Sequence, residues 1–162
     1  MERDYERLVQ YLTSEKKFYS ELLEISPQKK KAIIANDIDV LNFIVEKEKN
    51  IIENIEIMGK NRIQCIANIG RKLNLDHNPT LKQIIDTSKE DVSELENLQK
   101  ELKQIVTQLK AHNSINNDLA RIQLDFIYSF KSAFFDGQGS YGVDGKDVDA
   151  KRQSVNLLDR MV

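Results

Sequence analysis

The segment with the clearest chemical signature is glycine-rich and reads Gly137-Gln138-Gly139-Ser140-Tyr141-Gly142, which matches the GxGxxG pattern of dinucleotide-binding loops. In those loops a strand precedes the glycines and a helix begins directly after them, so that backbone N–H groups hold a pyrophosphate. Here a phenylalanine-rich segment of helical periodicity precedes the glycines, and no strand–helix–strand pattern surrounds them. We therefore interpret this segment as a linker and expect no nucleotide cofactor.

Metal ligands and catalytic groups are scarce. The two histidines, His77 and His112, lie far apart, and no ExxH pair is present to build a carboxylate-bridged metal site in a helical bundle. No GxSxG or HExxH motif occurs, and the single cysteine, Cys65, falls on an apolar helical stripe, where a small buried side chain is expected. The sequence predicts no metal site, no cofactor and no catalytic residues, and therefore a protein that is not an enzyme.

Two clusters in the last third of the chain could serve binding. The first is polar, and it consists of His112, Asn113, Asn116 and Asn117. It fits a buried polar layer that fixes the register of a helical bundle, which we favour, or a polar rim for a partner helix. The second is apolar and holds four of the six phenylalanines within ten residues. It comprises Ile122, Phe126, Ile127, Phe130, Phe134 and Phe135. This cluster fits either a bundle core or an exposed groove for an amphipathic helix, which recognises apolar residues spaced by three and four.

Long helices must position these clusters, because helix breakers are rare. Only Pro27, Gly59, Gly70 and Pro79 precede Gly137, after which three further glycines follow within eight residues. Apolar residues recur at spacings of three and four in the segments between the breakers, which is typical of amphipathic helices. We predict helices over residues 3–35, 38–73, 81–86 and 90–135. The last of these would be on the order of 70 Å long, so a rod is expected.

Local signals predict where these helices begin and end. Pro27 removes a backbone donor and predicts a kink or a restart in the first helix. Asn36-Asp37 predicts a tight turn with Asp37 as N-cap of the second helix. Thr80 with Gln83 predicts a capping box for the short helix, and Ser88 with Asp91 the same start signal for the last one.

Composition and charge exclude several classes of protein. The net charge is −2, from 24 basic and 26 acidic side chains, and no basic face is evident, so a nucleic-acid partner is not expected. The longest apolar run, Ala32-Ile33-Ile34-Ala35, is far shorter than the roughly 20 residues of a membrane-spanning helix. The first residues lack the apolar stretch of a secretory signal. A single cysteine fits a reducing compartment, so a cytoplasmic protein without membrane insertion is expected.

The predicted fold is therefore all-α. We expect an elongated antiparallel helical bundle or coiled coil of about three long helices plus one short helix, over residues 1–135. Residues 136–162 are predicted to form a flexible glycine-rich tail. Within that tail Val155, Leu158 and Val162 share one face of a possible short amphipathic helix.

The order of several features resembles a known family. The turn Asn36-Asp37-Ile38-Asp39 is followed by a helix carrying Lys47-Glu48-Lys49, and Pro79-Thr80-Leu81 leads into the short helix. The last helix has an Asn-Asn-x-Leu step at Asn116, Asn117 and Leu119. The end of the chain has Ser140-Tyr141-Gly142, then Gly145 and finally Leu157-Leu158-Asp159-Arg160. Together, and over nearly the whole chain, these features resemble the flagellar export chaperones called FlgN, although Pro27 is not expected from that family.

The resemblance implies a cytoplasmic, non-enzymatic binding protein. Members of the family hold hook-filament junction (hook-associated) proteins, prevent their premature aggregation and deliver them to the flagellar type III export gate. By resemblance, cargo binding belongs to the C-terminal part of the last long helix, and Tyr141 and Gly142 of the tail dock at the export gate. The predicted cargo-binding residues are Leu119, Ile122, Phe126, Ile127, Phe130 and Phe134. The alternative is a structural coiled-coil module that oligomerises through the same phenylalanine-rich end and has no cargo.

Overall fold

The computed structural model describes residues 2–75 and 78–135, the last four by backbone alone, and this part of the chain is helical and contains no strand. Its helices are α1 (Glu2–Ala35), α2 (Ile38–Lys72), α3 (Leu81–Thr87) and α4 (Ser93–Phe135). The predicted all-α class is confirmed, and most of the predicted helix ends agree to within one residue. The GxGxxG segment, His77 and the predicted tail lie outside the described residues.

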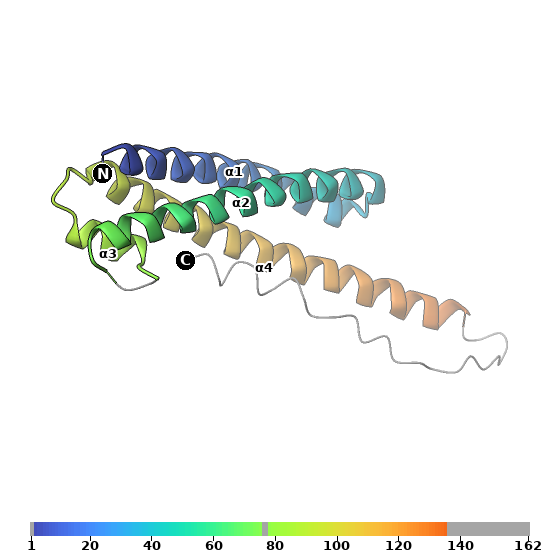
Figure 1. Ribbon diagram of the computed structural model, residues 1–162. Coiled ribbons are helices and arrows are strands. Elements are labelled where there is room, and N and C mark those ends of the chain that lie inside the picture. The colour runs from blue at the N-terminus through green and yellow to red at the C-terminus, as the bar shows by residue number, and fades with distance from the viewer. Residues whose placement is uncertain (1, 76–77, 136–162) are drawn as a thin grey trace, which may run out of the picture.

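The three long helices form an elongated bundle in which α1 is the shared partner. α1 packs along both α2 and α4, whereas the backbones of α2 and α4 hardly approach each other. Ion pairs join Glu15 to Arg62 and Lys29 to Glu48, so that later residues of α1 meet earlier residues of α2. Lys16 of α1 pairs with Glu101 of α4. Successive long helices are antiparallel, as predicted, and α1 and α4 run in the same direction (Figure 1).

The turns that end α1 and α2 are both built on asparagine. Asn36 has φ 51° and Asn74 has φ 56°, in the left-handed region that asparagine tolerates better than most residues. At the first turn the N–H of Asp37 donates to the carbonyl of Ala32 at 3.0 Å, which closes a Schellman motif. Asp37 then caps α2, because its Oδ1 accepts from the N–H of Val40 at 3.0 Å. The predicted turn and cap are confirmed.

The start of α3 agrees with the prediction from the sequence, whereas the start of α4 differs from it. Thr80 and Gln83 form the predicted capping box at the start of α3. Ser88, by contrast, is the C-cap of α3, and α4 begins at Ser93 instead of near residue 90. The predicted start was wrong because Asp91 accepts from the N–H of Ser93 two residues on, which forms a turn in place of a capping box.

Pro27 lies inside α1, and the helix does not restart there. The predicted restart is therefore wrong. Ser26 is buried and accepts hydrogen bonds from Asn116 of α4 at both its carbonyl oxygen and its hydroxyl. Packing of α1 between two neighbours thus holds the helix together where the missing proline N–H weakens it.

The bundle core consists of two apolar clusters separated by a polar pair. One cluster lies at the end where α3 packs, and it includes Leu8, Leu12, Ile69, Ile84 and Leu95. The other lies farther along the rod. It includes Tyr19, Ile25, Ile44, Ile55, Val106 and Leu109. Glu15 and Arg62 come between the two clusters along α1 and α2, so the packing there is not wholly apolar.

Candidate protein-binding surface

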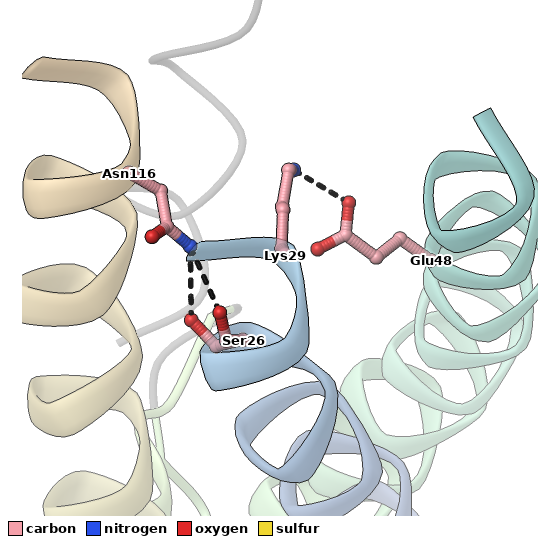
Figure 2. A network of polar contacts seen from close by, with 4 residues as sticks. All are labelled: Ser26, Lys29, Glu48 and Asn116. Carbon is pink, nitrogen blue, oxygen red and sulfur yellow. Dashed lines mark hydrogen bonds and ion pairs between the residues drawn. The ribbon is translucent and has the colours of Figure 1, made fainter. Parts of the chain in front are cut away.

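Asn116 marks the place where α4 makes its last buried contact with the bundle. Its Nδ2 donates to the carbonyl oxygen of Ser26 at 3.2 Å and to the Ser26 hydroxyl at 3.3 Å. On the other side of α1, Lys29 donates to Glu48 of α2 at 2.6 Å, so polar contacts tie α1 to both neighbours at this level (Figure 2). Asn116 is buried, His112 and Asn113 are half-buried and Asn117 is exposed. The favoured interpretation, a polar layer within the bundle, therefore holds for Asn116, whereas Asn117 faces solvent.

Beyond Asn116 the helix leaves the bundle. Residues 117–135 continue α4 for about 28 Å, and this segment extends past the α1–α2 turn and away from it (Figure 1). Large apolar side chains are exposed along it, up to 65% for Phe126 and 67% for Tyr128. The exposed set in this half of α4 comprises Ile122, Leu124, Phe126, Ile127, Tyr128 and Phe130. Single exposed apolar residues are ordinary, but six within nine residues form a patch of the kind that marks an interaction site.

The patch is exposed because α4 has left the bundle, and the apolar stripe of the helix also changes direction here. Leu95, Leu98 and Leu109 face the bundle, and Asn116 continues their line. The next apolar residues at spacings of three and four are Leu119, Ile122, Phe126 and Phe130, which we call the phenylalanine stripe. At 100° per residue this stripe is rotated roughly 100° from the line of Leu95 to Asn116. An uninterrupted helix thus carries one apolar face into the bundle and presents another to solvent.

The structure places the predicted cargo-binding residues on this free half. Ile122, Phe126, Ile127 and Phe130 are exposed and Leu119 is half-buried, while the side chain of Phe134 lies outside the described residues. Phe126 and Phe130 lie together, with ring centroids 6.4 Å apart. Ile122, Phe126, Ile127 and Phe130 are exposed, so these members of the apolar cluster do not form a core of this chain.

The prediction missed two further exposed side chains of the same segment, Leu124 and Tyr128. Their spacing of four residues was the signal that could have found them, since it places both on one face of the helix. Charges around the patch are balanced, with Asp118 and Asp125 against Arg121 and Lys131. The Asp118–Arg121 pair, at 3.5 Å, is fully at the surface. The patch is therefore apolar without a dominant charge.

A second group of exposed apolar residues lies at the α1–α2 turn and was also missed. Phe43 is 72% exposed, and Ile34, Ile38 and Val40 near it are exposed as well. Phe43 and Ile38 belong to a mainly apolar segment, residues 38–45, in which Asp39 is the one charged residue, and its first turn follows directly on the N-cap Asp37. The predicted helix was correct there, but α4 has diverged from the bundle at this level and does not cover its apolar positions near the turn.

Titratable groups in the bundle interior serve packing. Arg62 Nε donates to Glu15 Oε1 at 3.0 Å, and burial raises the pKa of Glu15 while the Arg62 charge opposes that shift. Burial, together with the Glu15 charge, raises the pKa of Tyr19 to about 12. Burial likewise raises the pKa of the Cys65 thiol, which donates to the carbonyl of Asp4 at 3.4 Å, as expected for a small buried side chain. Within residues 2–75 and 78–135 no group of three metal-ligating side chains occurs.

Comparison with protein families gives one match. The family model described as FlgN protein matches residues 1–148, which is more than half of the chain. The chain belongs to the FlgN family. The matched range includes Ser140, Tyr141 and Gly142, so the family assignment extends past the described end of α4.

FlgN proteins are chaperones of flagellar protein export, which agrees with the resemblance drawn from the sequence. Searches of curated proteins and of solved structures found no match. In the described ranges, no helix has the length and apolar character needed to cross a membrane. Tyr141 and Gly142, the residues predicted to dock at the export gate, lie outside the described residues.

Proposed function

We propose that this FlgN protein is a cytoplasmic export chaperone that binds hook-filament junction proteins through the exposed half of α4. The observation that carries the proposal is the phenylalanine stripe, which faces solvent on a helix segment that has left the bundle. Junction proteins assemble through helices with apolar faces. A helix that offers apolar residues at spacings of three and four covers such a face until export.

The geometry favours binding by helix-against-helix packing. Ile122, Phe126 and Phe130 follow one another along about 12 Å of helix, which is a little over two turns. Aromatic residues supply much of the binding energy at protein interfaces, and Phe126 and Phe130 are both more than half exposed to solvent. The balanced charge around them leaves the apolar contact as the main source of affinity.

The test measures binding of a purified junction protein by calorimetry to Phe126→Ala and Phe130→Ala variants. We expect each variant to bind about fivefold more weakly or worse, which corresponds to about 1 kcal/mol for a side chain that anchors the complex. Because both side chains are exposed, the free energy of unfolding of the unbound chaperone should hardly change. Phe43→Ala is the matched control, since Phe43 is at least as exposed as Phe126 and Phe130 but lies at the α1–α2 turn.

Three outcomes bear on this proposal. Weaker binding by the Phe126 and Phe130 variants, with Phe43→Ala normal, supports it. Normal binding by all three variants contradicts it and moves the cargo site elsewhere. If the Phe126 and Phe130 variants instead lose self-association in sedimentation experiments, and no junction protein binds the original chain, the coiled-coil oligomerisation module is the better description.

We further propose that the segment after residue 135 acts separately from cargo binding and that Tyr141 and Gly142 dock at the export gate. The support is the family match, which includes both residues, and their place among Gly137, Gly139 and Gly145. A tyrosine offers a large contact area and a hydroxyl at small conformational cost. Tyr141→Ala should leave stability and cargo affinity unchanged while lowering gate binding and filament assembly. A lower melting temperature with normal gate binding would contradict this role.

A further inference from the structure

A groove lies between α2 and α4 in the half of the bundle where α3 packs. Its floor is α1, with Leu12 and Tyr19, and its walls include Ile63 on α2 and Val106 on α4. The connector at Pro79 and the start of α3 close one end. The groove has a volume of about 550 Å³. It exists because α2 and α4 each pack on α1 and hardly on each other.

The interior of the groove is apolar and partly exposed to solvent. Ile63 is 61% exposed and points from the α2 wall, and Leu102 on the facing wall is half-buried. On α4 the lining runs from Gln99 to Val106, about 10 Å or two helical turns. Two parallel walls on a helical floor are the place that a fourth helix occupies in a four-helix bundle. The shape therefore fits one short helix better than a compact ligand.

Charges at the groove have one dominant sign. Its lining includes Arg62, Lys82 and Lys103 but a single carboxylate, Glu15, which is already paired with Arg62. Lys82 and Lys103 are exposed, and neither has an ion-pair partner among the residues that the structure describes. Acidic side chains of a bound molecule could therefore form ion pairs with Lys82 and Lys103 without breaking an ion pair that already exists.

We propose that this groove binds a short amphipathic helix of a partner protein, with apolar side chains spaced by three and four and acidic residues along their flank. The site is distinct from the phenylalanine stripe, because Val106 and Leu119 are about 20 Å apart along α4. It also differs in charge, since the patch around the stripe is balanced and the groove rim is basic. The inference goes beyond the proposed cargo binding and does not depend on it.

The test uses two synthetic helical peptides of about three turns that share one leucine-rich face. One peptide has glutamates on the flank and the other has lysines at the same positions. Binding of the fluorescently labelled peptides to the full chain is followed by anisotropy at low and high ionic strength. We expect the glutamate peptide to bind about tenfold or more tightly than the lysine peptide, and added salt to reduce that difference.

Variants of the chain locate the binding. Lys82→Glu with Lys103→Glu should reverse the preference, because both side chains are exposed and the change affects the rim without disturbing the core. Ile63→Asp should weaken binding of the glutamate peptide. Phe126→Ala should leave it unchanged, and this separates the groove from the cargo surface. Equal binding of both peptides to the original chain would overturn the proposal. So would loss of glutamate-peptide binding in Phe126→Ala while the Lys82→Glu, Lys103→Glu variant still binds that peptide as the original chain does. Neither outcome changes the interpretation of the cargo experiment.

Discussion

Replacing Arg62 by methionine tests how the bundle tolerates the carboxylate of Glu15 between its two apolar clusters. The Glu15 side chain is 3% exposed and that of Arg62 is 16% exposed, with 3.0 Å between Oε1 and Nε. Removing one partner of a buried pair costs about 3–5 kcal/mol, because the remaining charge is left without compensation. Arg62 lies at the groove, through which water can reach the carboxylate, so we expect about 3 kcal/mol, the lower end of that range.

The penalty should depend on pH in a defined direction. Burial raises the pKa of Glu15, and the Arg62 charge and hydrogen bond lower it again in part. In Arg62→Met the Arg62 charge no longer opposes the effect of burial on the pKa of Glu15. The Glu15 carboxyl of the folded chain therefore keeps its proton at pH values where the same group in the unfolded chain has lost it. The free energy of unfolding of the variant is then highest below about pH 4, where Glu15 is protonated in both the folded and the unfolded chain. That stability is lost as the pH rises through the folded pKa.

Urea denaturation of the original chain and of the variant, from about pH 4 to pH 8, measures both effects. The matched control is the double variant Glu15→Gln with Arg62→Met, which has no buried charge. At neutral pH the free energy of unfolding of the double variant should differ less from that of the original chain than the value for Arg62→Met does. This difference should be nearly constant with pH. A penalty for Arg62→Met below about 1 kcal/mol, or one that does not grow with pH, would refute the view that Arg62 compensates a buried charge.

Two further predictions concern packing between elements. A Cβ atom at Gly70 would overlap Cγ of Pro79. Gly70→Ala should therefore lower the free energy of unfolding by about 1–2 kcal/mol, although alanine has the better helix propensity. In thermal melts, adding Pro79→Ala to this variant should recover part of the loss. If Gly70→Ala stabilises the chain, the close packing of Pro79 on α2 is wrong. Asn116→Asp would place a buried charge against the carbonyl of Ser26 and should cost about 2 kcal/mol or more at neutral pH, with less loss in acid. Equal urea midpoints for this variant and the original chain at both pH values would show that Asn116 is not part of a buried layer.

Local sequence signals were sufficient for most of the fold. Asn36 and Asp37 define the first turn, and Thr80 with Gln83 defines the start of α3, because each uses hydrogen bonds within a few residues. Pro27 was misread because the cost of its missing N–H is balanced by packing of α1 against two helices, which local sequence does not reveal. Ser88 was misread because the same side chain can cap a following helix or end a preceding one.

The binding surfaces show the same distinction between local and long-range information. The shift of the apolar spacing after Asn116 is visible in the sequence, but it left open whether Phe126 and Phe130 belong to a core or to an exposed groove, and the structure shows both side chains exposed. Whether that half packs on the bundle depends on the direction in which α4 runs after Asn116, which spacing alone does not give. The groove around Ile63 was missed entirely, since its lining comes from four segments that only the folded chain brings together.

The continuity of α4 through Asn116 also determines how the exposed half becomes ordered. Helix formation has a costly nucleation step and inexpensive propagation, so a separate peptide of this size is only marginally helical in water. In this chain the packed residues from Leu95 to Asn116 supply the nucleus, and the exposed turns add to it one at a time. A partner therefore meets side chains already arranged in helical order, and less conformational entropy is lost on binding than with an unstructured segment of the same composition. The bundle thus acts as a folding template for a surface that it does not cover.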